Sequence, residues 1–237
     1  MSKPFRFKEF TIHQDKTAMK VGTDGVLLGA WTSVENNPFA ILDIGAGTGL
    51  IALQLAQRCH SEVIDAIEIE DNAYEQAVDN FENSPWSDRL FCYHAGLDEF
   101  VAEIEDTYDL IVSNPPFYTE KYKTESIQRD TARFTDSLPF EELVEGVSKL
   151  LEPTGTFCTI IPFKEHAHFI NLAEANGLFP QKTCHVKGNP EADFKRSLLS
   201  FSFKKTENII TELIIETKRH QYTNAYISLT KDFYLKL

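Results

Sequence analysis

A short stretch of polar, cyclic and aromatic residues, Asn114-Pro115-Pro116-Phe117, has the residue types needed to hold a flat amine. It follows an apolar run at 108–113 that predicts a strand, so it lies at a strand end. The side-chain oxygen of Asn114 and the carbonyl oxygen of Pro115 can accept hydrogen bonds from an exocyclic amino group, and Phe117 offers a ring for stacking. Such a site presents a nitrogen atom to an electrophile. Asn-Pro is also common in ordinary turns, so the tetrapeptide alone leaves that alternative open.

A glycine-rich loop follows another predicted strand and is the second informative segment. Gly45, Gly47 and Gly49 occupy every second position, and a helical pattern begins after them. Glycines at such a place let the backbone turn sharply and approach a ligand closely. Glu68 lies near the end of the next apolar run, where an acid in a doubly wound sheet accepts hydrogen bonds from a ribose diol.

The spacing of the loop distinguishes between nucleotide cofactors. A nicotinamide dinucleotide site needs G-x-G-x-x-G, whereas this chain has G-x-G-x-G preceded by Asp43. A pyrophosphate favours a helix N-terminus without a neighbouring carboxylate, but a sulfonium cofactor that carries an amino group can use negative charge. Asp43 and Glu68 together therefore favour S-adenosylmethionine.

The glycine loop, the acidic strand end and the Asn-Pro-Pro-Phe sequence together resemble the class I, Rossmann-like amino-methyltransferases. Three flanking segments, 20–31, 129–133 and 231–235, narrow the resemblance to the bacterial tRNA1(Val) (adenine(37)-N6)-methyltransferases. The matching segments extend over nearly the whole chain. Because several substrate classes share the tetrapeptide, the narrower assignment depends on these flanking segments. The resemblance implies methylation of N6 of an adenosine in tRNA, at adenosine 37 next to the anticodon of a valine tRNA.

The resemblance also implies which residues bind the cofactor. The glycines would line its methionine part, Asp43 would orient its amino group and Glu68 would bind its ribose. Ile69 would flank the adenine, with backbone near Leu97 as a further contact. For Thr23 and Asp24, capping of the following helix is an alternative role. The implied cofactor residues are Lys20, Thr23, Asp24, Asp43, Gly45, Ala46, Gly47, Gly49, Glu68, Ile69 and Leu97.

Methyl transfer from a sulfonium is an in-line displacement, and an aromatic amine has its lone pair conjugated with the ring. Hydrogen bonds to Asn114 and Pro115 favour a pyramidal nitrogen and stabilise the positive charge that develops there. A strong general base is not required. The predicted catalytic residues are Asn114, Pro115, Pro116 and Phe117, and the predicted substrate contacts are Tyr118, Arg129, Arg133, Lys195 and Arg196. Internal salt bridging is an equal alternative for Arg129 and Arg133.

The net charge of −13 is the main objection to a nucleic-acid substrate, because Lys and Arg normally neutralise phosphates. The charge is uneven, however. Residues 121–133 carry four bases against two acids, and residues 182–205 carry six bases against two acids. These stretches are consistent with a local basic surface beside the pocket, although solvated surface lysines explain each of them equally well.

The length of 237 residues suits one α/β domain. We expect a cap segment at 1–35, a Rossmann-like core at 36–205, and an edge strand and helix at 206–237. The core is predicted to be a mostly parallel, seven-stranded sheet with one antiparallel strand, preceded by a short strand or hairpin. Without a long apolar run or signal segment, we expect a cytoplasmic protein that binds no membrane. The four scattered cysteines indicate neither zinc nor disulfides, and we expect a monomer without a metal.

Alternative functions remain open at this stage. The same tetrapeptide suits other planar amines, namely guanine N2 in rRNA, adenine in DNA or a glutamine amide in a protein. The glutamine enzymes usually have Tyr at the position of Phe117. A nucleotide-binding oxidoreductase conflicts with the glycine spacing. A noncatalytic RNA-binding module is disfavoured by the presence of Asp43, Glu68 and Asn114.

Overall fold

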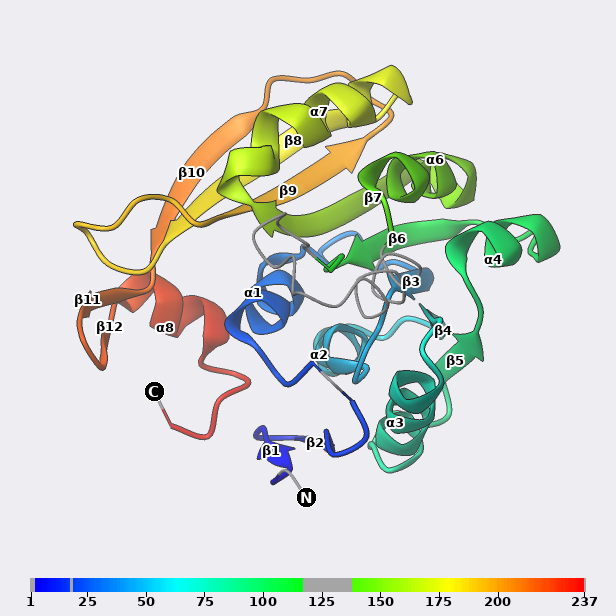
Figure 1. Ribbon diagram of the computed structural model, residues 1–237, viewed down its shortest axis with the longest axis horizontal. Coiled ribbons are helices and arrows are strands. Elements are labelled where there is room, and N and C mark those ends of the chain that lie inside the picture. Colours follow the sequence, from blue (N-terminus) through cyan, green and yellow to red (C-terminus); the bar gives the residue numbers. More distant parts are fainter. Residues whose placement is uncertain (1–2, 18, 117–137, 237) are drawn as a thin grey trace, which may run out of the picture.

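The computed structural model describes residues 3–17, 19–116 and 138–236. Its centre is a twisted eight-stranded sheet (Figure 1). The strands lie in the order β10 (Ile209–Ile214), β8 (Phe179–Lys187), β9 (Arg196–Ser202), β7 (Leu151–Pro162), β6 (Tyr108–Ser113), β3 (Ala40–Ile44), β4 (Val63–Glu68) and β5 (Leu90–His94).

Only β9 runs antiparallel within this sheet, pairing with β7 on one side and β8 on the other. The prediction of a mostly parallel sheet with one antiparallel strand is therefore confirmed. Seven of the strands lie between residues 40 and 202. The eighth, β10, pairs in parallel with β8 and forms the edge strand that the sequence indicated near the C-terminal end.

Helices cover both faces of the sheet because its strands carry apolar side chains on both faces. In β3, for example, Ile41 belongs to one buried cluster and Leu42 to the other. The first cluster includes residues of α1 (Thr23–Trp31), α2 (Leu50–Arg58) and α3 (Asp71–Glu82). The second includes residues of α4 (Leu97–Glu103), α6 (Phe140–Leu150) and α7 (His166–Ala175). The alternation of parallel strands and helices is the doubly wound arrangement.

The expected N-terminal hairpin is present as β1 (Phe5–Arg6) and β2 (Thr11–Ile12). Its turn is held by aromatic packing, with the rings of Phe7 and Phe10 stacked at 4.7 Å. Phe7 also forms a β-bridge with Tyr234, so the hairpin lies against the end of the chain that follows α8 (Asn224–Thr230). Figure 1 shows β1, β2 and α8 along the same lower part of the molecule.

Two short elements were not predicted. The first is α4, and the second is a hairpin of β11 (Glu216–Lys218) and β12 (Gln221–Tyr222). Both are too short for a periodic pattern to identify. Within the described ranges, none of the helices combines the length and apolar character that crossing a bilayer requires.

Candidate active site

The glycine loop and the Asn-Pro-Pro sequence leave the sheet side by side. In the parallel pair of β3 and β6, Ile44 is opposite Ser113, so Gly45 and Asn114 are the next residues along each strand. Neighbouring strands lie about 4.8 Å apart. The hydroxyl of Ser113 donates a hydrogen bond of 2.9 Å to the carbonyl of Ile44, which ties the two strand ends together. The carboxyl edge of the sheet therefore brings both predicted motifs to one place.

Asn114 has an acceptor ready for a ligand. Its Oδ1 atom is buried and has no hydrogen-bond partner among the described residues. A buried carbonyl oxygen without a partner is costly, and such atoms often mark a site that a ligand completes. Pro115 is buried beside it, whereas Phe117, Tyr118, Arg129 and Arg133 lie outside the described residues. The predicted roles of those four residues therefore stay predictions.

Asp43 provides a second incomplete acceptor near the same edge. It is fully buried on β3, and its Oδ2 accepts a hydrogen bond of 3.1 Å from the backbone of Ala52. Its Oδ1 has no partner among the described residues. Burial raises the pKa of Asp43 to about 7; the Ala52 hydrogen bond opposes this rise, and the charge of Glu68 adds to it. A bound ammonium group would supply both the missing donor and the missing positive charge.

The three glycines of the loop have two different functions. All of them have positive φ, at 72° for Gly45, 57° for Gly47 and 76° for Gly49. A Cβ on Gly49 would lie 2.4 Å from the Phe81 ring, so this glycine permits close packing. At Gly45 and Gly47 a Cβ would meet no atom of the described residues within 4 Å. Those two positions therefore leave open space beside the backbone for a ligand.

Glu68, at the end of β4, supports the loop. Its Oε2 accepts a hydrogen bond of 2.7 Å from the Gly47 backbone, and its Oε1 accepts one of 2.9 Å from the Glu70 backbone. Each carboxylate oxygen has a further lone pair, so these bonds leave acceptor capacity for a ribose diol. Ile69, the next residue, is exposed. The side chain of Leu97 is buried against Gly146, so only its backbone is available to a cofactor.

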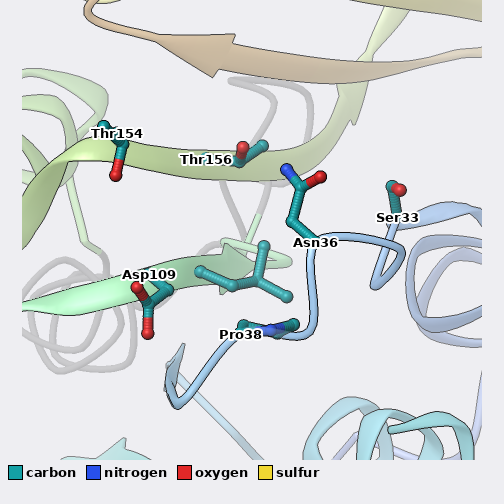
Figure 2. Close-up of a pocket in the computed structure, with 7 residues that line it drawn as sticks. Ser33, Asn36, Pro38, Asp109, Thr154 and Thr156 are labelled. Carbon is teal, nitrogen blue, oxygen red and sulfur yellow. The ribbon is translucent and has the colours of Figure 1, made fainter.

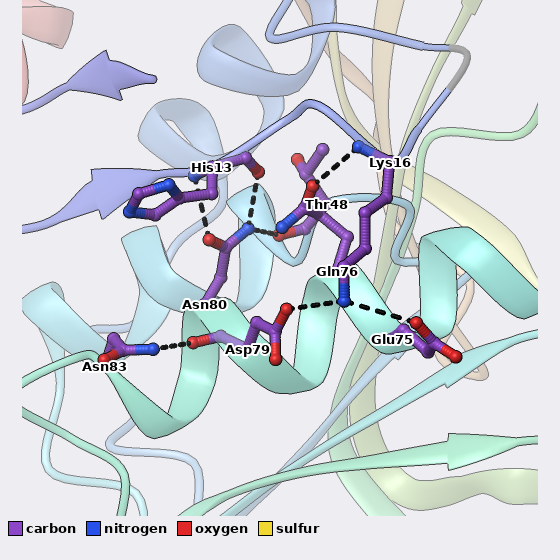
Figure 3. Close-up of polar contacts among 8 residues, drawn as sticks. All are labelled: His13, Lys16, Thr48, Glu75, Gln76, Asp79, Asn80 and Asn83. Carbon is purple, nitrogen blue, oxygen red and sulfur yellow. Dashed lines mark hydrogen bonds and ion pairs between the residues drawn. The ribbon is translucent and has the colours of Figure 1, made fainter. Parts of the chain in front are cut away.

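The N-terminal segment is fixed to the glycine loop through α3, as Figure 3 shows. The amide of Asn80 accepts a hydrogen bond of 2.8 Å from the His13 backbone and donates bonds of 2.9 Å to the carbonyls of His13 and Thr48. One turn earlier on α3, Gln76 accepts a bond of 3.0 Å from the Lys16 backbone. Sequence reasoning missed Asn80, although a polar residue on the buried face of an amphipathic helix is a visible signal.

Of the three upstream residues predicted to bind the cofactor, Lys20 and Asp24 have partners within the protein. The Lys20 ammonium donates hydrogen bonds to the carbonyls of Gln14 and Thr17. Asp24 accepts a bond of 2.7 Å from Arg196, and Thr23 lines a hollow of about 320 Å³ together with Tyr226. Lys20 thus stabilises the loop that precedes it, between Gln14 and Thr17. Asp24 pairs with Arg196, which was predicted to contact RNA.

The basic stretch at 182–205 is divided between the two edges of the sheet. Lys187, Lys195 and Arg196 lie where β8 ends and β9 begins, on the same edge as Asn114. Lys204 and Lys205 follow the end of β9 and therefore lie on the opposite edge. Only the first three are placed to act together with Asn114.

A second hollow lies away from the carboxyl edge of the sheet that carries Gly45 and Asn114. It has a volume of about 270 Å³ and is lined by residues that include Asn36, Asp109 and Thr156 (Figure 2). Asn36 precedes β3, Asp109 is the second residue of β6, and Thr156 is paired with Leu110 on β6, so the hollow lies away from the strand ends that carry Gly45 and Asn114. Over the described ranges, no group of three His, Cys, Asp or Glu side chains could hold a metal ion.

Comparison with known proteins agrees with this site. A family model described as "Methyltransferase small domain" matches residues 26–174. A relative from Flavobacterium johnsoniae, named tRNA1(Val) (adenine(37)-N6)-methyltransferase, is 64% identical over 98% of this chain and 100% of its own length. This chain belongs to that methyltransferase family. A relative with the same name from Christiangramia forsetii is 58% identical to the methyltransferase over 100% of this chain and 99% of its own length. Another from Trichodesmium erythraeum is 47% identical over 98% of this chain and 98% of its own length.

Solved structures show the same fold at low sequence identity. A predicted O-methyltransferase from Agrobacterium tumefaciens has a TM-score of 0.69 and 20% identity over 89% of this chain and 96% of its own. A ribosomal protein L11 methylase from Lactobacillus delbrueckii has a TM-score of 0.54 and 15% identity, covering 76% of this chain and 77% of its own. As a class I methyltransferase, the protein uses S-adenosylmethionine as its methyl donor. The Oδ1 atom of Asp43, which has no partner among the described residues, and the open side of Gly45 and Gly47 fit the amino-acid part of that cofactor.

Proposed function

We propose that this methyltransferase modifies the exocyclic N6 of an adenosine in tRNA, at adenosine 37 next to the anticodon of a valine tRNA. The observation that carries the proposal is the Oδ1 atom of Asn114, which is buried without a hydrogen-bond partner among the described residues, one strand away from the glycine loop. Supporting it are the relatives of 58–64% identity that carry this activity in their names.

The residues at the carboxyl edge of the sheet around Gly45 and Asn114, which we call the catalytic edge, explain how an amine is selected and activated. When bound, S-adenosylmethionine supplies a methyl group made electrophilic by a positively charged sulfur. The side-chain oxygen of Asn114 and the carbonyl of Pro115 accept hydrogen bonds from the two N–H groups of the adenine amine and so fix the direction of its lone pair. Both oxygens stabilise the positive charge that develops on nitrogen, in a site that needs no reorganisation. After transfer, the proton leaves to water, so no strong base is needed beside Asn114.

Asp43, Glu68 and the glycine loop hold the donor in line with this nitrogen. The free Oδ1 of Asp43 accepts a hydrogen bond from the cofactor amino group, and ionisation of Asp43 strengthens it. Glu68 binds the ribose while its bond to the Gly47 backbone keeps the loop in its shape. The predicted contacts of Phe117 and Tyr118 with the base belong to this proposal as well.

An adenosine in an anticodon loop suits the site energetically. Its base is already unpaired, so most of the unstacking cost that duplex DNA imposes is absent. The net charge of −13 opposes RNA binding as a whole, and the basic residues on the catalytic edge offset it locally. We further propose that the enzyme acts as a monomer in the cytoplasm.

The test is transfer of labelled methyl groups from S-adenosylmethionine to total tRNA, followed by digestion and nucleoside analysis. The expected product is N6-methyladenosine. A valine tRNA with guanosine at position 37 is the control, and it should yield none of this product. The same assay is run in parallel with rRNA, DNA and protein, and label found instead in N2-methylguanosine of rRNA, in DNA adenine or in a protein glutamine would overturn the proposal. Wild-type protein that labels none of these while still binding the cofactor would favour the noncatalytic alternative.

A further inference from the structure

Four aromatic rings form a cluster on the catalytic edge, outside the residues assigned so far. Phe163 follows β7 directly, at the start of the short 3-10 helix η2 (Phe163–Glu165). Its ring centroid lies 4.9 Å from that of His185 and 5.2 Å from that of Phe194, and His166 lies 4.9 Å from His185. His185 is also fixed by a contact of 3.0 Å with the hydroxyl of Ser197. The four rings therefore support one another.

The strand register places this cluster near Asn114. Ser113 on β6 is opposite Thr159 on β7, and β7 continues to Pro162 before Phe163 begins. Phe163 thus projects three residues, or about 10 Å, beyond the level of Asn114 on the neighbouring strand. This offset along the strand direction alone is too large for contact with the target base itself, and the ring also packs toward His185 on β8, further across the sheet from β6. The position suits a nucleotide that flanks the target base in the same RNA strand.

Exposure and charge show what the cluster can bind. The Phe163 side chain is large and apolar, yet Phe163 is 37% exposed. The ammonium of Lys187 lies 5.3 Å from the Phe194 ring centroid, and Lys195 is exposed beside it. Neither lysine forms an ion pair with a residue of the described ranges. An exposed ring next to two uncompensated cations has the character of a surface that stacks a base and holds its phosphate.

The surroundings contain acids as well, and they restrict the positive surface to these two lysines. Arg196 is paired with Asp24, and Lys164 with Glu165 at 3.3 Å. Glu191 and Asp193 lie in the connection between β8 and β9. Burial lowers the pKa of both His166 and His185, so these rings are neutral near pH 7 and pack as flat apolar groups. The ring cluster thus depends on packing and does not depend on histidine charge.

We propose that Phe163, Phe194, Lys187 and Lys195 form a second contact surface for the RNA, which binds a nucleotide flanking the target adenosine. The base of that nucleotide stacks on the exposed face of Phe163, and its phosphate lies between the two lysines. This inference rests on the proposed tRNA activity. Because every base has a stacking face, the contact adds affinity and fixes the position of the strand, without selecting a base.

The test compares two phenylalanines of similar exposure, one after the central strand β7 and one on the edge strand β5. Phe163→Ala should raise the KM for tRNA about tenfold, while kcat at saturating tRNA and the cofactor Kd stay near wild type. Phe91→Ala, on β5 and 44% exposed, is the control and should change none of these constants. Lys195→Ala should make tRNA binding less dependent on salt, by about one unit in the slope of log K against log salt.

The outcomes separate this inference from the tRNA activity on which it rests. Phe163→Trp keeps a stacking face, so a KM near that of the wild type supports the proposal even if the alanine variant folds poorly. If wild type is active on tRNA and a folded Phe163→Ala variant has an unchanged KM for tRNA, the proposed RNA-contact surface is overturned and the tRNA activity stands. The exposed rings would then suit contact with a protein partner. Wild-type enzyme that modifies no tRNA would overturn the tRNA activity instead.

Discussion

Arg196 donates a hydrogen bond of 2.7 Å from Nε to Oδ2 of Asp24, joining the start of β9 to the first turn of α1. The two residues are 172 positions apart in the chain. One was predicted to contact RNA and the other to contact the cofactor, yet in the folded protein they neutralise each other. The pair fixes α1 against the edge of the sheet that carries Asn114.

A double-mutant cycle should detect this pair. Asp24→Asn and Arg196→Gln are each expected to destabilise the protein, and the double variant should lose less than the sum. The coupling energy should be about 0.5–1 kcal/mol, because both side chains are partly exposed and solvent screens them. Urea unfolding of the four proteins measures it. Strictly additive effects would show that the contact does not contribute to stability.

The raised pKa of Asp43 predicts that ligand-free stability depends on pH. Its ordinary value of 3.8 rises to about 7 in the folded protein. Between these values the unfolded chain has released a proton that the folded protein still holds, so the free energy of unfolding falls as pH rises from about 4 to about 7. Asp43→Asn removes this term, and the ligand-free variant should be at least as stable as wild type at pH 8, as thermal unfolding will show.

The same substitution should weaken the cofactor site. Ionised Asp43 attracts the cofactor ammonium, so wild-type affinity should increase as pH rises through 7. Asp43→Asn should bind S-adenosylmethionine about 10- to 100-fold more weakly at pH 8 and should lose this pH dependence. Isothermal calorimetry at pH 6 and pH 8 measures both effects. Undiminished affinity in the variant would contradict the assignment of Asp43 to the cofactor.

Asn80 is expected to position the cofactor loop without touching the ligand. It is 1% exposed, and its amide joins His13 to Thr48. Asn80→Ala leaves buried backbone groups without partners and should cost about 1–3 kcal/mol in unfolding free energy. It should also raise the Kd for S-adenosylmethionine, because Thr48 belongs to the glycine loop.

Asn83→Ala is the matched control for that variant. Asn83 follows α3, and its exposed side chain donates a bond of 2.6 Å to the carbonyl of Asp79. Its substitution should leave the cofactor Kd unchanged. Calorimetry at a temperature where both variants are fully folded distinguishes positioning from general destabilisation. If Asn80→Ala lowers the melting temperature but leaves the Kd for S-adenosylmethionine unchanged, the proposed link between Asn80 and the loop is absent.

The meeting of the two motifs at one edge of the sheet was predictable from the sequence because it follows from local signals. Each strand preceding Gly45 or Asn114 is a short apolar run, and parallel strands in a doubly wound sheet end at one edge. The neighbouring positions of the two motifs therefore required no knowledge of side-chain contacts. The antiparallel strand was also predictable, since Gly188-Asn189-Pro190 lies between two strand patterns and indicates a close connection.

Contacts between distant segments were beyond such reasoning. The basic stretch at 182–205 appears as one charged segment in the sequence. In the structure β9 lies between Lys195 and Lys204, so these two residues are at opposite edges of the sheet. Lys20 and Asp24 match the family's upstream segment, yet their partners are distant or backbone groups that sequence does not reveal. Phe163 was not singled out, because its exposure depends on where β7 ends.

The central claim is that Asn114 holds the acceptor amine, and single-turnover methyl transfer to valine tRNA tests it most directly. With both proteins saturated by S-adenosylmethionine, Asn114→Ala should form N6-methyladenosine about 100- to 1000-fold more slowly than wild type, since it lacks a preorganised acceptor. Its cofactor Kd should stay within about twofold of wild type, because Asn114 does not hold the donor. A single-turnover rate equal to that of wild type would contradict the account.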